Sequence, residues 1–208
     1  MRRAEFLSKD WAVLRQHLAE IAFGTLALPT ESALPYLIPL SFSYDPPEKF
    51  TENNFGTLYF HGAPLGRKFE ILKNEPAAAF SAAKNYAYIP SAFLGGTMIP
   101  TQFFYSILAE GKIAVVADFA EKERILEHLV KKYEPQNAAF SMAVPPFKNK
   151  IKGTFVFKML ISNLTIKAKF GQNMSAKMFA EIQNDLKKRN ESGDAETLKM
   201  MNYFSKKP

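Results

Sequence analysis

The chain has 208 residues, of which 47% are apolar and 23% are charged, and it contains no cysteine. This composition is typical of a globular protein, and the length allows a core that needs no disulfide. The lack of cysteine excludes disulfides, cysteine-ligated zinc, iron–sulfur clusters and a thiol nucleophile. Glu5, Lys9 and Asp10 interrupt the apolar region that an export signal requires, and no apolar run approaches about 18 residues. We therefore expect a cytoplasmic protein without a membrane span.

The charge balance is 27 Lys and Arg against 20 Asp and Glu, a net charge of +7. No acidic residue lies between Glu134 and Glu181, a stretch that holds Lys148, Lys150, Lys152, Lys158, Lys167, Lys169 and Lys177. The stretch is open to three interpretations: a solvated basic face, a surface near an anionic ligand, or a nucleic-acid footprint. The wide spacing and the lack of a recognisable nucleic-acid motif favour the first interpretation over the third.

In the first half of the chain, apolar residues at three- and four-residue spacing predict a helix that Ser8 caps and Gly24 ends. The segment 35–44 alternates as a strand does, and Pro39 within it suggests an edge position. We expect further strands at 25–28, 57–61 and 77–83 and a short helix at 66–73.

In the second half, prolines and glycines predict a long loop or lid over residues 84–101. We expect a strand at 103–117 with a bulge at Gly111, a helix at 121–133, an irregular connection through Pro145, and a strand at 153–170. Two helices, at 175–189 and 195–204, complete the chain.

This order lacks the regular alternation of strand and helix that a doubly wound parallel sheet requires. It predicts a mainly β protein with peripheral helices (α+β), built on an antiparallel barrel. We expect one domain over residues 1–170, with residues 171–208 as a C-terminal helical extension packed on it.

The common catalytic motifs are missing. The sequence has no G-x-G-x-x-G, no phosphate-binding P-loop, no G-x-S-x-G and no H-E-x-x-H. Its three histidines, His17, His61 and His128, are far apart in the chain. The sequence therefore predicts no metal site.

Residues 57–76 (TLYFHGAPLGRKFEILKNEP) stand out. A predicted strand ends in His61, a glycine- and proline-containing turn follows, and Arg67 and Lys68 open a helix. Adjacent cations at the start of a helix suit a phosphate group. The alternative is a solvated basic pair on an ordinary helix.

This segment resembles the flavin-binding split-barrel family related to pyridoxamine 5'-phosphate oxidase, in particular its nitroimidazole-reductase-like branch. That branch carries an LYFH-small-Ala-x-x-G-(R/K)-K signature, which reads here from Leu58 to Lys68. Three further segments match in order: PYLIPLSFSYD (35–45), NEPAAAF (74–80) and YSILAEGKIAVV (105–116). The stretch 170–177 is faintly similar to an element of flavin-binding regulators. The loop at 84–103 lacks the Trp that is common in the family.

The resemblance implies a six-stranded antiparallel split β-barrel of Greek-key type, acting as a homodimer with FMN at the subunit interface. Arg67 and Lys68 would hold the FMN phosphate, and His61 would be a candidate for contact with substrate. The implied cofactor-binding residues are Pro39, Leu40, Ser41, Phe42, His61, Gly62, Ala63, Gly66, Arg67, Lys68 and Ser106.

The resemblance favours an FMN-dependent oxidoreductase that passes electrons from a reduced nicotinamide to a small organic acceptor. The alternative is a non-enzymatic flavin-binding regulator or flavin carrier. A haem-handling relative is a third possibility, for which the sequence offers no identifiable pocket.

Overall fold

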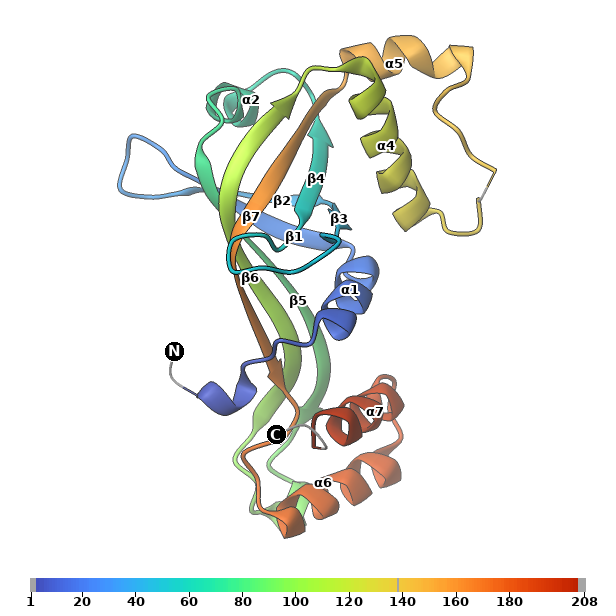
Figure 1. The fold of residues 1–208 in the computed structure, drawn as a ribbon. Helices are drawn as coiled ribbons and strands as arrows, with labels where there is room; N and C mark the ends of the chain where they lie inside the picture. Colours follow the sequence, from blue (N-terminus) through green and yellow to red (C-terminus); the bar gives the residue numbers. More distant parts are fainter. Residues whose placement is uncertain (1–2, 138, 206–208) are drawn as a thin grey trace. The chain divides into compact units, whose positions relative to one another are not determined.

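The computed structural model describes residues 3–137 and 139–205 (Figure 1). They form a seven-stranded antiparallel sheet with helices around it, so the α+β prediction is confirmed. The strands are β1 (Phe23–Leu28), β2 (Tyr36–Ser41), β3 (Ser43–Asp45), β4 (Thr57–Gly62), β5 (Ala77–Ile89), β6 (Thr101–Val116) and β7 (Phe155–Lys169). The α-helices are α1 (Trp11–Glu20), α2 (Arg67–Leu72), α3 (Phe93–Gly96), α4 (Phe119–Tyr133), α5 (Lys148–Gly153), α6 (Ala176–Arg189) and α7 (Asp194–Ser205). Short 3-10 helices cover Ala4–Phe6 and Pro145–Phe147. None of these helices is long and apolar enough to cross a membrane.

The order of strands in the sheet is β2-β1-β5-β6-β7-β4-β3. The strand expected at 35–44 is split at Phe42, and this split raises the strand count from the expected six to seven. Before Phe42, β2 pairs with β1, and after it β3 pairs with β4. One short segment therefore supplies both edges of the sheet. Pro39 lies in edge strand β2, as predicted, where a missing N–H is tolerated.

The chain divides into two compact units. One draws on residues up to Lys9, on Ala83–Ser106 and on the chain from Thr165 onward; the other consists of Asp10–Ala82 and Ile107–Leu164. We call them the helical unit, which contains α6 and α7, and the sheet unit, which contains α1, α2 and α4. Strands β5, β6 and β7 contribute residues to both. The expected division at residue 170 stays a prediction.

Aromatic side chains fill the core of the sheet unit. Phe42, Phe60, Phe80 and Phe157 are fully buried. The Phe60 and Phe157 rings stack with centroids 5.1 Å apart, and Phe42 meets Phe80 edge-on at 4.9 Å. A Cβ at Gly24 would overlap the Phe80 ring. Gly24 thus lies inside β1 beside this core, and its prediction as a helix terminator was wrong.

Helix α1 ends at Glu20, and its cap is Asp10 rather than Ser8. The Asp10 carboxylate accepts a hydrogen bond from the Val13 amide at 3.2 Å. The Ser8 amide instead donates to the Ile166 carbonyl, because the chain before α1 runs beside β7. The sequence offered two acceptable capping residues, and tertiary contact decided between them.

Within the helical unit, β5 continues to Ile89, where the sequence predicted a loop from residue 84. Ala87 and Ile89 are buried, and the Ala87 amide donates to the Thr197 hydroxyl at 2.9 Å. Helix α7 thus supports the end of this strand. The expected loop shrinks to residues 90–100, which include α3.

One other local expectation is wrong. Helix α5 lies in the connection that was expected to be irregular, because Ile151 packs into a buried cluster with Ile125 and Leu129 of α4. At Gly111, a Cβ would overlap the Leu160 carbonyl oxygen. That glycine lets β6 approach the backbone of β7 closely, and the expected bulge at Gly111 stays a prediction.

Candidate functional site

The turn between β4 and α2 carries most of the predicted site residues. β4 ends at Gly62, residues 63–66 are exposed, and α2 begins at Arg67. Gly66 has φ +84° and so occupies the left-handed region that glycine adopts without strain. A glycine at this position lets the chain leave the sheet and enter α2 within a few residues.

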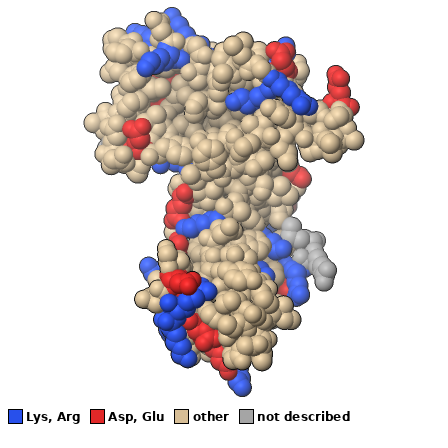
Figure 2. Space-filling model, turned by 180° about the vertical axis from the view of Figure 1, so that it is seen from behind, with Lys and Arg blue, Asp and Glu red and all other residues tan. Residues whose placement is uncertain are grey.

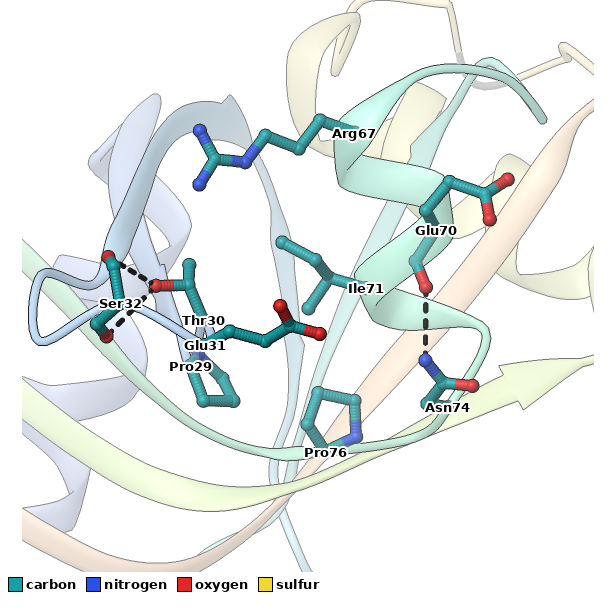
Figure 3. A pocket seen from close by; sticks show the side chains of 9 residues that line it. All are labelled: Pro29, Thr30, Glu31, Ser32, Arg67, Glu70, Ile71, Asn74 and Pro76. Atoms are coloured by element: carbon teal, nitrogen blue, oxygen red, sulfur yellow. Dashed lines mark hydrogen bonds between the residues drawn. The ribbon is translucent and has the colours of Figure 1, made fainter.

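Arg67 points into a cleft between α2 and the loop that follows β1 (Figure 3). The cleft has a volume of about 710 Å³. In Figure 3, Arg67 extends from α2 toward the loop, and Glu31 reaches into the space from the other side. The Arg67 guanidinium lies 4.6 Å from the centroid of the Tyr36 ring, at the start of β2. Among the described residues, no carboxylate forms an ion pair with Arg67.

Lys68 takes a different direction and lies over the backbone of Gly62, where a Cβ would overlap its Nζ atom. Its ammonium is also close to the exposed side chain of His61. Partial burial, and then the Lys68 charge, lower the pKa of His61 below its ordinary value. Both effects favour the neutral form of the His61 imidazole. His61, Gly62 and Lys68 thus lie together, whereas the Arg67 side chain points into the cleft.

The predicted residues on β2 and just after it are less uniform. Pro39 is exposed and Ser41 is half-buried, whereas Leu40 and Phe42 belong to the core. The amide of Phe42 donates to the hydroxyl of Tyr133 at 3.0 Å. Tyr133 was not predicted from the sequence, where its only signal is its place at the end of an amphipathic helix.

The remaining predicted site residues are Ala63 and Ser106. Ala63 lies exposed in the turn, and Ser106 lies in β6 within the helical unit. Cofactor contacts by Ser106 and by Pro39–Phe42 stay predictions.

The remaining histidines have structural partners. His17 is buried, with its Nδ1 atom 2.9 Å from the Val13 carbonyl oxygen. His128 Nδ1 lies 3.0 Å from the hydroxyl oxygen of Ser43. In the described part of the chain, no three His, Cys, Asp or Glu side chains come together as a metal site would need.

Three lysines of the acid-free stretch contact other residues of the fold. Lys158 pairs with Glu121 at 2.6 Å, Lys169 bonds to Thr101, and the ammonium of Lys167 lies beside the Phe6 ring. On the face seen in Figure 2, Lys and Arg form separate small groups with other residues between them. This scatter favours the interpretation of solvated lysines over a nucleic-acid footprint.

The fold and the turn together define a class: an antiparallel sheet protein with an uncompensated cation pair where a strand passes into a helix. The family model for pyridoxamine 5'-phosphate oxidase matches residues 10–168. The chain belongs to that family, as the sequence motifs predicted. No curated protein matches the chain.

Solved structures share the fold. A candidate 5-nitroimidazole antibiotic resistance protein from Bacteroides thetaiotaomicron matches with a TM-score of 0.60 at 18% identity, covering 77% of this chain and 85% of that one. The flavocytochrome Anf3 from Azotobacter vinelandii matches at 0.61 and 15% identity, covering 81% and 72%. An FAD- and haem-binding protein from Mycobacterium smegmatis matches at 0.61 and 18% identity, covering 78% and 73%.

Proposed function

We propose that this chain is an FMN-binding flavoprotein whose Arg67 and Lys68 hold the cofactor phosphate. One observation carries the proposal. The two cations of the family signature lie at the β4–α2 turn, and within the described residues neither has a carboxylate partner. The Arg67 side chain is exposed and that of Lys68 is half-buried, and two cations without carboxylate partners are suited to an external anion.

The residues present fit a phosphate-bearing flavin. A guanidinium and an ammonium are the donors that phosphate prefers, and the missing side chain at Gly62 leaves room for the Lys68 ammonium over the turn. Of the predicted cofactor-binding residues at positions 39–42, Pro39 and Ser41 offer accessible side chains to the flavin ring. Leu40 and Phe42 would contribute as the supporting core beneath them.

The fold supports the same proposal. Proteins described as a flavocytochrome and as an FAD- and haem-binding protein share this fold with the chain. We extend the proposal to a split barrel with Greek-key connections that works as a homodimer with FMN at the subunit interface. An interface position would place the exposed Leu37 and Leu65, 57% and 77% accessible, against a second copy.

The reaction that we propose is electron transfer from a reduced nicotinamide to a small organic acceptor, as in the nitroimidazole-reductase-like branch. Bound flavin supplies the hydride and electron chemistry. The chain anchors the phosphate through Arg67 and Lys68. His61 is exposed beside this anchor, and its neutral imidazole can donate or accept a proton at a substrate atom.

The test compares FMN with riboflavin, which lacks the phosphate. Fluorescence titration of the wild-type chain should show FMN binding at least about 100-fold more tightly, since each charge-assisted bond contributes about 1.5–3 kcal/mol. Equal affinity for the two flavins would refute the phosphate assignment.

Anaerobic titration of the FMN-loaded protein with NADH and NADPH then tests the reaction. Bleaching of the flavin absorption band supports the oxidoreductase. A flavin that binds tightly and is not bleached by either donor would favour the regulator or carrier instead.

A further inference from the structure

A second cavity lies within the sheet unit, between α1, the residues around β3, and α4. We call it the α1–α4 pocket. Its volume is about 500 Å³, and it shares no lining residue with the cleft at Arg67. Its charged and titratable lining residues are Arg15, Glu20, Tyr44, His128, Lys131 and Lys132. Three full positive charges thus face a single carboxylate.

Lys132 is the most enclosed of these cations. Its ammonium lies 3.6 Å from the centroid of the Phe42 ring and donates to the Ile21 carbonyl oxygen at 2.8 Å. Burial lowers the pKa of Lys132 to about 8, which shows how incompletely its surroundings replace water. No carboxylate of the described residues forms an ion pair with it. An anion in the pocket would provide the missing countercharge.

The other charges leave this excess in place. The Glu20 carboxylate accepts a hydrogen bond from the Gln16 side chain at 2.9 Å. Lys131 reaches Glu127 only at 3.9 Å and is 56% exposed, so this pair is weak. The Arg15 guanidinium lies over the Phe50 ring at 5.5 Å. Arg15 and Lys132 therefore remain as cations able to face a ligand.

The pocket also offers a neutral polar group and apolar walls. His128 is held through Nδ1 by the fully buried Ser43, and burial lowers the pKa of His128, so its imidazole is neutral at pH 7. Leu18, Tyr44, Pro46 and Pro135 supply apolar surface. A cavity with apolar walls and a few convergent polar groups is typical of a small-molecule site.

We propose that the α1–α4 pocket binds a small organic carboxylate, with its apolar body against these walls and its charge toward Lys132 and Arg15. This function lies beyond flavin binding, because none of its residues belongs to the proposed phosphate anchor. Lys132 and Phe42 are in contact, so an occupied pocket would adjoin one of the residues that the family resemblance places near the cofactor.

Benzoate and its uncharged analogue benzamide are suitable probes, applied to the full flavin-loaded chain. Saturation-transfer NMR and calorimetry should detect benzoate binding at millimolar concentration or below, and benzamide at least about 10-fold more weakly. Equal binding of the two probes, or no binding of benzoate by the wild-type chain, would overturn the proposal.

Variants locate the binding. Lys132→Met should weaken benzoate binding about 10-fold or more, and Arg15→Gln provides a second variant should the first fail to fold. Lys188→Gln, an exposed lysine of α6, is the matched control and should leave the affinity unchanged. If Arg67→Gln abolishes benzoate binding while Lys132→Met does not, the probe binds the phosphate anchor and the proposal is wrong.

Discussion

Consecutive basic residues lie at the end of α6 and at the start of α2, and their surroundings in the fold differ. α6 ends with Lys187, Lys188 and Arg189, and the last of these is fully engaged. The Arg189 guanidinium donates to both carboxylate oxygens of Asp194, at 3.0 and 2.5 Å, and to the Tyr88 carbonyl oxygen at 2.8 Å. α2 begins with Arg67 and Lys68, neither of which forms an ion pair with a carboxylate of the described residues.

The comparison distinguishes a structural charge, which is neutralised by a partner within the fold, from an available charge, which has no such partner. Asp194 is 2% exposed and also accepts from the Glu191 amide, so Arg189 joins α6 to the start of α7 and to β5. The charge of Arg189 is therefore neutralised within the fold. The charges of Arg67 and Lys68 stay available to an external partner. The sequence alone does not distinguish the two sets, because both are basic runs at a helix end.

Removing the available charge should have the largest effect, and on binding rather than folding. Arg67→Ala combined with Lys68→Ala should weaken FMN binding by about 100-fold or more, because it removes two charge-assisted bonds to phosphate. The free energy of unfolding should change little, because both side chains lack ion pairs within the fold. Parallel flavin titrations and urea unfolding check both expectations, and wild-type FMN affinity in the double variant would contradict the first.

Removing the structural charge should do the reverse. Asp194→Ala should lower the free energy of unfolding by about 3–5 kcal/mol, because it removes the buried carboxylate that takes two bonds from Arg189 and leaves this guanidinium only the exposed Glu191 as an ion-pair partner. FMN affinity of the folded fraction should stay at the wild-type value. Glu191→Ala is the matched control, since Glu191 is exposed and its loss should cost less than about 0.5 kcal/mol. Equal effects of the two variants would remove the distinction.

Lys132 is an intermediate case, a half-buried cation held by a ring and a carbonyl. Its folded pKa of about 8 lies below the ordinary value of 10.5, so between pH 8 and 10.5 the unfolded chain binds more protons. Its contribution to stability therefore rises with pH in that window. The free energy of unfolding of Lys132→Met, taken relative to the wild-type chain at the same pH, should therefore be roughly 1–3 kcal/mol lower at pH 10.5 than at pH 7.5. Urea unfolding at both pH values measures this, and a pH-independent difference would refute it.

The smallest effect on stability is expected at His61. Its side chain is exposed and makes no hydrogen bond within the described residues, so His61→Ala should change the free energy of unfolding by less than about 0.5 kcal/mol. A thermal melt beside turnover per bound flavin separates the possible roles. If His61→Ala lowers the free energy of unfolding by more than about 1 kcal/mol, His61 has a structural role, which would argue against substrate contact.

Local sequence was enough to predict the β4–α2 turn and both C-terminal helices. The turn depends on neighbouring residues: a strand ending at His61, a glycine that permits positive φ, and the two cations that follow. The α6 and α7 boundaries follow from their own apolar spacing. The family motifs added what composition could not, namely a reason to connect this turn with a flavin.

The errors arose where distant segments decide the outcome. Strand β5 continues past residue 84 because Thr197, more than a hundred residues later, bonds to Ala87. The α1–α4 pocket combines residues near 15, 44 and 130, so no window of the sequence contains it. The contacts of Tyr133 likewise join segments that are far apart in the sequence: its hydroxyl lies 2.5 Å from the Ala22 carbonyl oxygen and bonds to Phe42.

The split at Phe42 has a consequence for how this protein can change over evolutionary time. Residues on either side of Phe42 are locked into two registers at once, Ser41 opposite Phe23 and Ser43 opposite Tyr59. Inserting or deleting one residue between them would turn the side chains of one strand to the wrong face while the other stayed in place. The segment should therefore tolerate substitutions but keep a constant length, and loops such as 46–56 should absorb the variation in length instead.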